Sequence, residues 1–519
     1  MSEATNNPAP ANVPQQQPSS ARSTRRDFLR RSAMAAALVP LAEAGASLAA
    51  AATQPSDPPP QPSKPNVLLV ISDQYRWDFV CGYGQNPMDF TPNLDAMLHR
   101  GTAFQNAFTN QPLCSPARSC LFTGMYANQT GVWRLGLGLR QDAVTLATIL
   151  RGAGYSTNYI GKWHLAPNSG GDVASHGYVP PQYRGGFDDL WQASNELERT
   201  SHPYQGSMWD GAGKEMTYDG IYRVDYLTNL AIKFLQQKQE KPFFLVLSQL
   251  EPHQQNDLNG FAPPKGYDEL FRNPFVPPDL RPFPGDWPFQ LANYYGDCKS
   301  IDESMGKIFQ TLRQQNLEDN TIVIFLSDHG CHFRTRNVEY KRSPHESSIH
   351  VPLIIQGPGF NNSRMIPEMV SLVDFAPSLL AALGLPIPPS MKGRNFVPLI
   401  DAAAARASWR NEIFIQISES ETARAIRTPE WTYVALAPDA DLRQDPGSPE
   451  YRDYQLYNNF ADPAQIVNLA GRSDPPRLVQ FAGNRSMTEI TDHLRQRLLA
   501  RMKEAGEPPA RIARWEFYP

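Results

Sequence analysis

The run NVLLVIS, residues 66–72, is a short and continuous apolar stretch that ends directly in Asp73. A run of this length without polar alternation is typical of a strand that is buried on both faces of a sheet. Similar runs recur at Phe243–Ser248, Thr321–Ser327 and Val351–Gln356. The pattern therefore predicts several buried strands that belong to one sheet.

Helical patterns lie between the predicted strands, at Thr91–Arg100, Asp142–Ala153, Arg223–Gln239, Asn293–Gln314 and Asp374–Leu383. Buried strands that alternate with amphipathic helices favour an α/β fold with helices on both faces of the sheet. In such sheets, ligands bind outside the carboxyl ends of the strands. Asp73 and Asp328 each directly follow a predicted strand, so we expect both carboxylates at one edge, where a metal site would form.

The pattern changes after about residue 385, where prolines cluster at 386–389. Glu412–Ile417 and Trp431–Leu436 are predicted to be antiparallel strands, and Glu489–Glu504 is predicted to be a terminal helix. We therefore expect a main domain over residues 66–385 and a smaller C-terminal α+β subdomain over residues 386–519.

Composition limits the classes of function. The chain has 519 residues, of which 41% are hydrophobic, enough for one large and one smaller domain. A formal net charge of -4 gives no basic excess, so we expect no nucleic-acid partner. The cysteines are too few for a disulfide scaffold, and their pairing stays open: Cys81, Cys114, Cys120, Cys298 and Cys331.

The N-terminus has the features of a targeting segment. Residues 1–22 are polar, and the paired Arg25 and Arg26 precede an alanine-rich stretch that runs to residue 52. Residues 1–52 therefore resemble a disordered N-terminus with a twin-arginine export signal, and residues 53–65 a Pro-rich linker. The alternatives are an amphipathic helix or a membrane anchor, but Glu43 interrupts the apolar run. The signal predicts export by the twin-arginine translocase to a periplasmic or extracellular location.

Two motifs follow in order along the chain. The first is CSPAR, residues 114–118, followed by Thr123 and Gly124; the second is GYSTNYIGKWH, residues 154–164. Together they resemble the signature blocks of the formylglycine-dependent (type I) sulfatases, which belong to the alkaline phosphatase superfamily. The resemblance implies a large mixed sheet flanked by helices, with the catalytic domain in residues 66–385.

The resemblance also implies the role of each residue in these motifs. A formylglycine-generating maturation enzyme would oxidise Cys114, and a hydroxyl of the hydrated aldehyde would attack sulfur. Lys162 would neutralise sulfate oxygens, and His164 would contact the diol. Arg118 would also contact the diol; the alternative is a salt bridge at the start of a helix that begins near Ser119.

A metal site is implied by two pairs of residues, Asp73-Gln74 and Asp328-His329. With the oxygen derived from Cys114, they would hold one divalent cation. Ca²⁺ is the expected ion, with Mn²⁺ and Mg²⁺ as alternatives. Gln74 can offer a carbonyl oxygen to a hard cation, whereas His329 suits manganese or zinc better than calcium.

Two further residues complete the resemblance. His253, in the segment Leu250-Glu251-Pro252-His253, would protonate the leaving oxygen. Lys341 would be a second sulfate ligand. The nearby His345 and His350 are predicted to be supporting or surface residues.

The resemblance therefore predicts a sulfuric ester hydrolase, similar to arylsulfatases, that acts on sulfate monoesters. The loops over 194–220 and 253–287 are rich in aromatic residues, which favours a sulfated small molecule or glycan as the substrate. The alternative is a phosphonate monoester or phosphodiester hydrolase, because such enzymes share the fold and some share the nucleophile. A non-catalytic binding protein would be expected to lack Cys114, Lys162 or the aspartates, which are all present.

Overall fold

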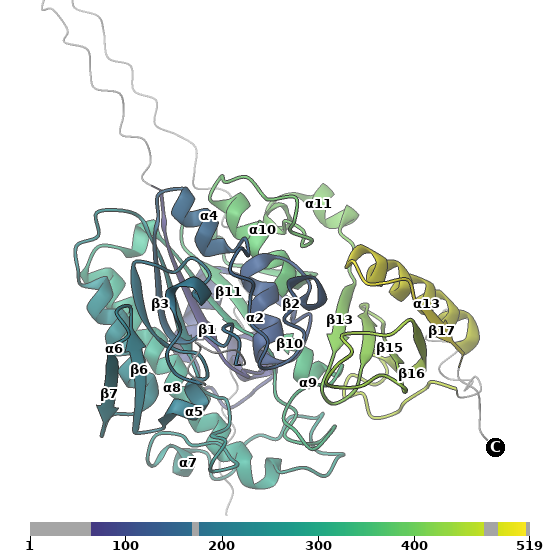
Figure 1. Ribbon diagram of the computed structural model, residues 1–519. Coiled ribbons are helices and arrows are strands. Elements are labelled where there is room, and N and C mark those ends of the chain that lie inside the picture. Colours follow the sequence, from purple (N-terminus) through teal and green to yellow (C-terminus); the bar gives the residue numbers. More distant parts are fainter. Residues whose placement is uncertain (1–63, 169–175, 472–485, 515–519) are drawn as a thin grey trace, which may run out of the picture. The chain divides into compact units, whose positions relative to one another are not determined.

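Strand β1 (Asn66–Ser72) lies inside the main sheet, and all of its residues are buried. It pairs in parallel with β8 (Phe243–Gln249) on one side and with β9 (Thr321–Ser327) on the other. Figure 1 shows this computed structural model, which describes residues 64–168, 176–471 and 486–514. The predicted export signal at residues 1–52 and nearly all of the linker lie outside the described residues.

The main sheet has 12 strands within the described residues, in the order β10-β2-β11-β9-β1-β8-β3-β4-β6-β5, with β12 beside β2 and β7 beside β6. Parallel pairs such as β3–β8 and antiparallel pairs such as β11–β9 make it a mixed sheet, as predicted. The other strands are β2 (Thr102–Phe108), β3 (Ser156–Lys162), β4 (Leu190–Ser194), β5 (Ser201–His202), β6 (Gln205–Asp210), β7 (Glu215–Asp219), β10 (His350–Val351), β11 (Leu353–Gln356) and β12 (Arg364–Ser371).

Each face of the sheet has its own core. Leu68 and Val70 of β1 pack with α1 (Pro92–Arg100), α6 (Arg223–Leu235) and α8 (Trp287–Gln314). On the opposite face, alternate residues of β1 pack with α2 (Cys114–Thr123), α4 (Leu146–Gly152) and α10 (Leu372–Ala382). The sheet is therefore covered by helices on both sides, as the alternating pattern predicts.

The boundaries differ from the predictions where local chemistry intervenes. The predicted strand at 351–356 is divided into β10 and β11 at Pro352, which has no N–H to donate to a ladder. Helix α4 begins at Leu146, because the Thr145 side chain accepts a hydrogen bond from Thr148 N–H and caps it. Helix α8 begins at Trp287, six residues before the predicted start at Asn293.

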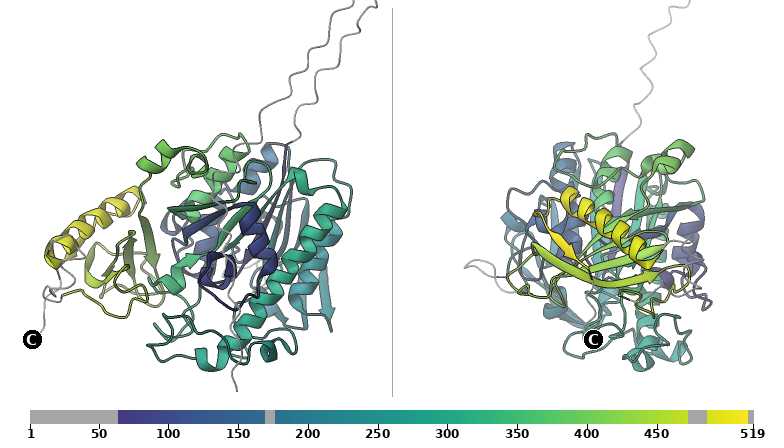
Figure 2. Two further views of the ribbon diagram at one scale, coloured as in Figure 1. Left: turned by 180° about the vertical axis from the view of Figure 1, so that it is seen from behind. Right: turned by 90° about the vertical axis from the view of Figure 1, so that its right-hand side faces the viewer.

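The C-terminal part forms a second sheet of five strands, in the order β13-β14-β15-β16-β17. Helix α13 (Met487–Glu504) packs on one face of it through a row of apolar residues, and Figure 2 shows this helix in yellow across the strands. This agrees with the predicted α+β architecture. The strands are β13 (Ile413–Ile417), β14 (Ala423–Arg427), β15 (Trp431–Leu436), β16 (Glu450–Asn458) and β17 (Arg511–Ala513).

The second sheet is attached to the main one next to the CSPAR motif. The Asn110 side chain donates a hydrogen bond to the Phe414 carbonyl at 3.0 Å and accepts one from Val373 N–H at 2.9 Å. All five cysteines lie within the described residues and are free thiols. No helix in the described part of the chain is long and apolar enough to cross a membrane.

Candidate active site

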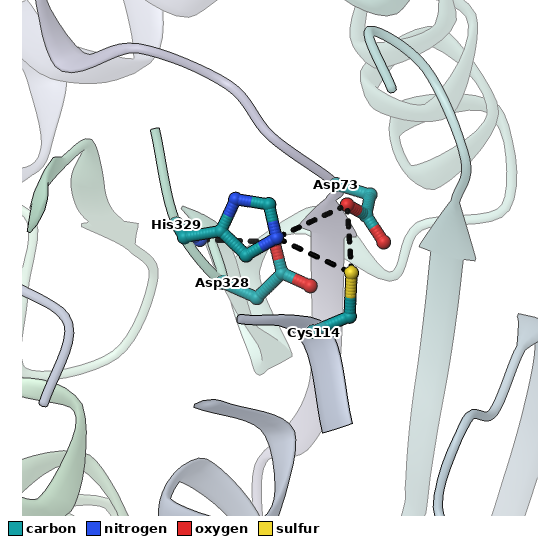
Figure 3. A group of neighbouring side chains, drawn as sticks. All are labelled: Asp73, Cys114, Asp328 and His329. Carbon is teal, nitrogen blue, oxygen red and sulfur yellow. Dashed lines mark hydrogen bonds and ion pairs between the residues drawn. The ribbon is translucent and has the colours of Figure 1, made fainter. Parts of the chain in front are cut away.

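The predicted site residues meet at the carboxyl ends of the parallel strands. Asp73 follows β1, Asp328 follows β9, Lys162 ends β3, and Cys114 begins α2. The ligand atoms of Asp73, Cys114, Asp328 and His329 all lie within 4.8 Å of one another, and all four residues are buried. Figure 3 shows the four side chains converging on one point. The sequence prediction that both aspartates share an edge is therefore correct.

Cys114 lies at the centre of this group and is only 1% exposed. Its Sγ is 3.1 Å from Lys341 Nζ, 3.3 Å from His329 Nε2, and 3.6 Å from both Lys162 Nζ and Asp73 Oδ1. Burial raises the pKa of the thiol, but Lys162, Lys341 and His329 outweigh burial and lower the pKa well below its ordinary value. The position therefore stabilises a negatively charged atom, which is sulfur in Cys114 and would be an oxygen in formylglycine.

Arg118 is fully buried and joins the two aspartates. Its Nε donates to Asp328 Oδ2 at 3.0 Å, and one Nη donates to Asp73 Oδ2 at 3.2 Å. The other Nη donates to the Lys162 carbonyl and to Ser248 Oγ. Arg118 therefore forms salt bridges, as the alternative interpretation of this residue predicts, and its contact with the diol stays a prediction. The predicted start of the helix near Ser119 is wrong, because α2 begins at Cys114 and contains Arg118.

Lys162 and His164 share a partner that sequence analysis did not identify. Lys162 Nζ lies 2.8 Å from Asp73 Oδ2 and 3.0 Å from Glu198 Oε1, and His164 Nδ1 lies 3.6 Å from the same Glu198 oxygen. Glu198 is in the short helix α5 (Leu197–Thr200), where no motif or periodicity marks it. Glu198 lies within the aromatic-rich segment 194–220, and this is all that the sequence offers to place it near the substrate.

His253 and Lys341 lie next to each other, and Lys341 contacts Cys114. His253 Nδ1 is 2.7 Å from the Gln254 carbonyl, so this nitrogen carries the proton and donates it. His253 Nε2 then accepts a hydrogen bond from Lys341 Nζ at 2.9 Å. Burial, together with Lys341 and Lys162, lowers the pKa of His253, so the free site holds a neutral imidazole with Nε2 turned toward the cluster.

The donor set fits a divalent cation. Gln74 follows Asp73, and its Oε1 is buried and has no hydrogen-bond partner among the described residues, so this oxygen is available to a ligand. His329 Nδ1 lies 3.0 Å from the Gly330 carbonyl, which fixes the ring and leaves Nε2 toward Cys114 and Asp73. Burial and the neighbouring Asp73 raise the pKa of Asp328, a repulsion that a cation would relieve.

Other candidates lie outside this cluster. His345 contacts the Tyr457 hydroxyl at 3.3 Å, and His350 contacts Glu346 at 3.2 Å. Both side chains are buried, so the alternative that they are surface residues is wrong, and the supporting role stays a prediction.

Comparison with known proteins identifies the family. The sulfatase family profile matches residues 65–385, and the profile "N-sulphoglucosamine sulphohydrolase, C-terminal" matches residues 338–504. A fold and a site of this kind define a sulfuric ester hydrolase. The chain belongs to the sulfatase family.

Relatives match along most of the chain. The ulvan-active sulfatase of Formosa agariphila is 30% identical over 481 residues, which cover 88% of each protein. The endo-4-O-sulfatase of Bacteroides thetaiotaomicron is 28% identical and covers 79% of this chain and 88% of its own. The crystal structure of a putative sulfatase, yidJ, from Bacteroides fragilis superposes with a TM-score of 0.70 at 25% identity, over 88% of this chain and 98% of that one.

Removal of Arg118 tests its structural role. The substitution Arg118→Ala removes the guanidinium between two buried carboxylates and leaves Asp73 with Lys162 and Asp328 without its arginine partner, so we expect a loss of about 3–5 kcal/mol in the free energy of unfolding. Urea denaturation measures this loss. Arg140→Ala is the control, because it breaks the exposed pair with Asp142 and should leave stability unchanged. Equal effects of both substitutions would contradict the role of Arg118.

Proposed function

We propose that the protein hydrolyses sulfate monoesters, with sulfated carbohydrates as the substrate class, by means of a nucleophile formed from Cys114. The observation that carries this proposal is the convergence of two buried ammonium groups, Lys162 and Lys341, on Cys114 Sγ at 3.6 and 3.1 Å. The same Cys114 sulfur also belongs to the group of ligand atoms that forms the predicted cation site. A sulfate group at this point would be surrounded by positive charge on several sides.

Each residue has a proposed task in this reaction. Oxidation of Cys114 to formylglycine by a maturation enzyme supplies a hydrated aldehyde whose hydroxyl is the nucleophile. A divalent cation held by Asp73, Gln74, Asp328 and His329 would supply a Lewis acid. Lys162 and Lys341 hold the sulfate oxygens, and Arg118 fixes both aspartates.

His253 is the proposed general acid. Its Nε2 lies 2.9 Å from Lys341 Nζ, which itself lies 3.1 Å from Cys114 Sγ, so an ester placed at Cys114 would have its leaving oxygen near this nitrogen. The negative charge of a bound ester favours the protonated imidazole, which counters the low pKa of the free site. His164 lies with Lys162 against Glu198 and is proposed to orient the nucleophile.

The carbohydrate substrate is supported by a relative that acts on ulvan. The alternative, a phosphonate monoester or phosphodiester hydrolase, is favoured by one specific observation, the imidazole of His329 in the predicted cation site. This nitrogen ligand suits Mn²⁺ better than Ca²⁺. Both substrate classes present a single negative charge, so the charge of the cluster alone does not separate them.

A substrate panel separates the two readings. Purified protein, produced together with a maturation enzyme, should turn over aryl sulfates and sulfated glycans faster than a phosphodiester or a phosphonate monoester. The peptide that contains Cys114 should have the mass of formylglycine, and Cys114→Ala should lower kcat by about 1,000-fold or more. Cys120→Ala, in the same helix, is the control. Dominant phosphodiester turnover would overturn the sulfatase proposal, and full activity of Cys114→Ala would overturn the nucleophile.

Metal removal tests the proposed cation. Dialysis against a chelator should abolish most of the activity, and separate additions of Ca²⁺, Mn²⁺ and Mg²⁺ should identify the ion that restores it. Gln74→Leu removes the unpartnered Oε1 at a similar side-chain volume, so it should raise the ion concentration needed for half-maximal activity. Activity that persists in protein shown to be metal-free would exclude the cation.

We also propose export by the twin-arginine route, on the pattern of residues 23–52. Replacement of Arg25 and Arg26 by lysine should leave active protein in the cytoplasm, which cell fractionation and the sulfatase assay would reveal. Arg30 and Arg31, replaced in the same way, form a matched control that should still be exported. Normal export of the first variant would refute this route.

A further inference from the structure

Glu198 is a buried carboxylate in the site that no step of the proposed reaction uses. It is 7% exposed, and its Oε1 contacts Lys162 Nζ at 3.0 Å. Its second oxygen, Oε2, is buried and has no hydrogen-bond partner among the described residues. A buried carboxylate oxygen without a donor is costly, which suggests a function that requires the charge.

Glu198 is ionised at neutral pH. Burial raises its pKa, but Lys162, His164 and His253 outweigh burial and lower the pKa to about 2. The same three residues are those proposed to handle the sulfate, the nucleophile and the leaving oxygen. A full negative charge therefore lies against the group that would receive an anionic substrate.

The Glu198 carboxylate has a different environment from those of Asp73 and Asp328. Asp73 and Asp328 lie at the predicted cation position and are joined by Arg118, whereas Glu198 lies in a separate group with His164 and Glu196. Its group with His164 and Glu196 could in principle hold an ion. However, Glu198 Oε1 already forms an ion pair with the Lys162 ammonium, and Glu196 Oε2 forms one with Arg199 at 2.6 Å. This group is therefore a network of ion pairs.

We propose that Glu198 determines specificity by charge: it selects esters that carry one negative charge, such as sulfate monoesters, and rejects phosphate monoesters that carry two. The Coulomb energy between two groups scales with the product of their charges. Glu198 therefore opposes a dianionic ester about twice as strongly as a monoanionic one at the same place. This inference rests on the proposed function, because it assigns the ester group to the position of Cys114.

Glu198 also positions Lys162 and His164, so its loss should weaken the binding of every substrate. That loss affects a sulfate and a phosphate ester alike, whereas the charge effect differs between them. The ratio of the two activities thus reports the charge effect alone. Because both esters are measured on one preparation, the ratio does not depend on the fraction of folded or modified protein.

The test compares 4-nitrophenyl sulfate with 4-nitrophenyl phosphate at about pH 8, where the phosphate ester carries two charges. Glu198→Gln keeps the shape of the side chain and removes the charge. We expect it to raise the phosphate-to-sulfate ratio of kcat/KM by about tenfold. Glu198→Asp keeps the charge and should leave the ratio within about twofold of the wild type. Glu196→Gln is the matched control, because it removes the charge of a nearby carboxylate that pairs with Arg199, whereas Glu198 pairs with Lys162.

A binding measurement makes the inference independent of catalysis. In the Cys114→Ala background, which cannot use the proposed nucleophile, calorimetry with the same two esters gives the ratio of Kd values. Glu198→Gln in this background should shift that ratio toward the phosphate ester by a similar factor. Unchanged ratios in Glu198→Gln would overturn the inference even when the protein is an active sulfatase. A shifted binding ratio in a protein without sulfatase activity would support charge selection and refute the proposed function.

Discussion

The buried contact between Arg118 and the two aspartates, Asp73 and Asp328, is the constraint on which the site depends. Asp73 and Asp328 directly follow two neighbouring parallel strands, so parallel pairing brings their carboxylates close together. The guanidinium lies between the two carboxylates and bonds to both. The planar fork of arginine reaches both carboxylates through Nε and one Nη, and its other Nη donates to the Lys162 carbonyl and to Ser248 Oγ. Since Arg118 lies one turn after Cys114 in α2, the same contact also fixes the start of that helix over the strand ends.

Much of this arrangement is predictable from the sequence. Uninterrupted apolar runs identify β1, β8 and β9, because a strand buried on both faces needs no polar alternation. The aspartates that follow two of these runs then share an edge by the geometry of parallel pairing. The motif residues Cys114 and Lys162 also meet there, at 3.6 Å. The roles of these residues in catalysis stay predictions, whereas their proximity is established.

Other features could not be predicted because they depend on contacts between distant segments. Glu198 has no motif around it and lies in a helix of four residues, so only the folded chain brings it to Lys162, 36 positions earlier. The salt bridges of Arg118 form because α2 packs against the ends of β1 and β9, and the sequence of α2 alone does not specify that position. The division of the strand at Pro352 was visible as a proline in the run, but its effect depends on which side of the strand pairs.

The burial of Cys114 imposes an order of events on the life of the molecule. Only 1% of this residue is reachable from solvent, and it lies beneath side chains contributed by segments up to residue 341. An enzyme that oxidises this thiol, as we propose, would therefore have to reach it before the chain has closed over it. Folding and the proposed modification would then compete in time, and a molecule that folds first would stay inactive for as long as it stays folded. The specific activity of a preparation would thus record the outcome of a race between two rates during synthesis.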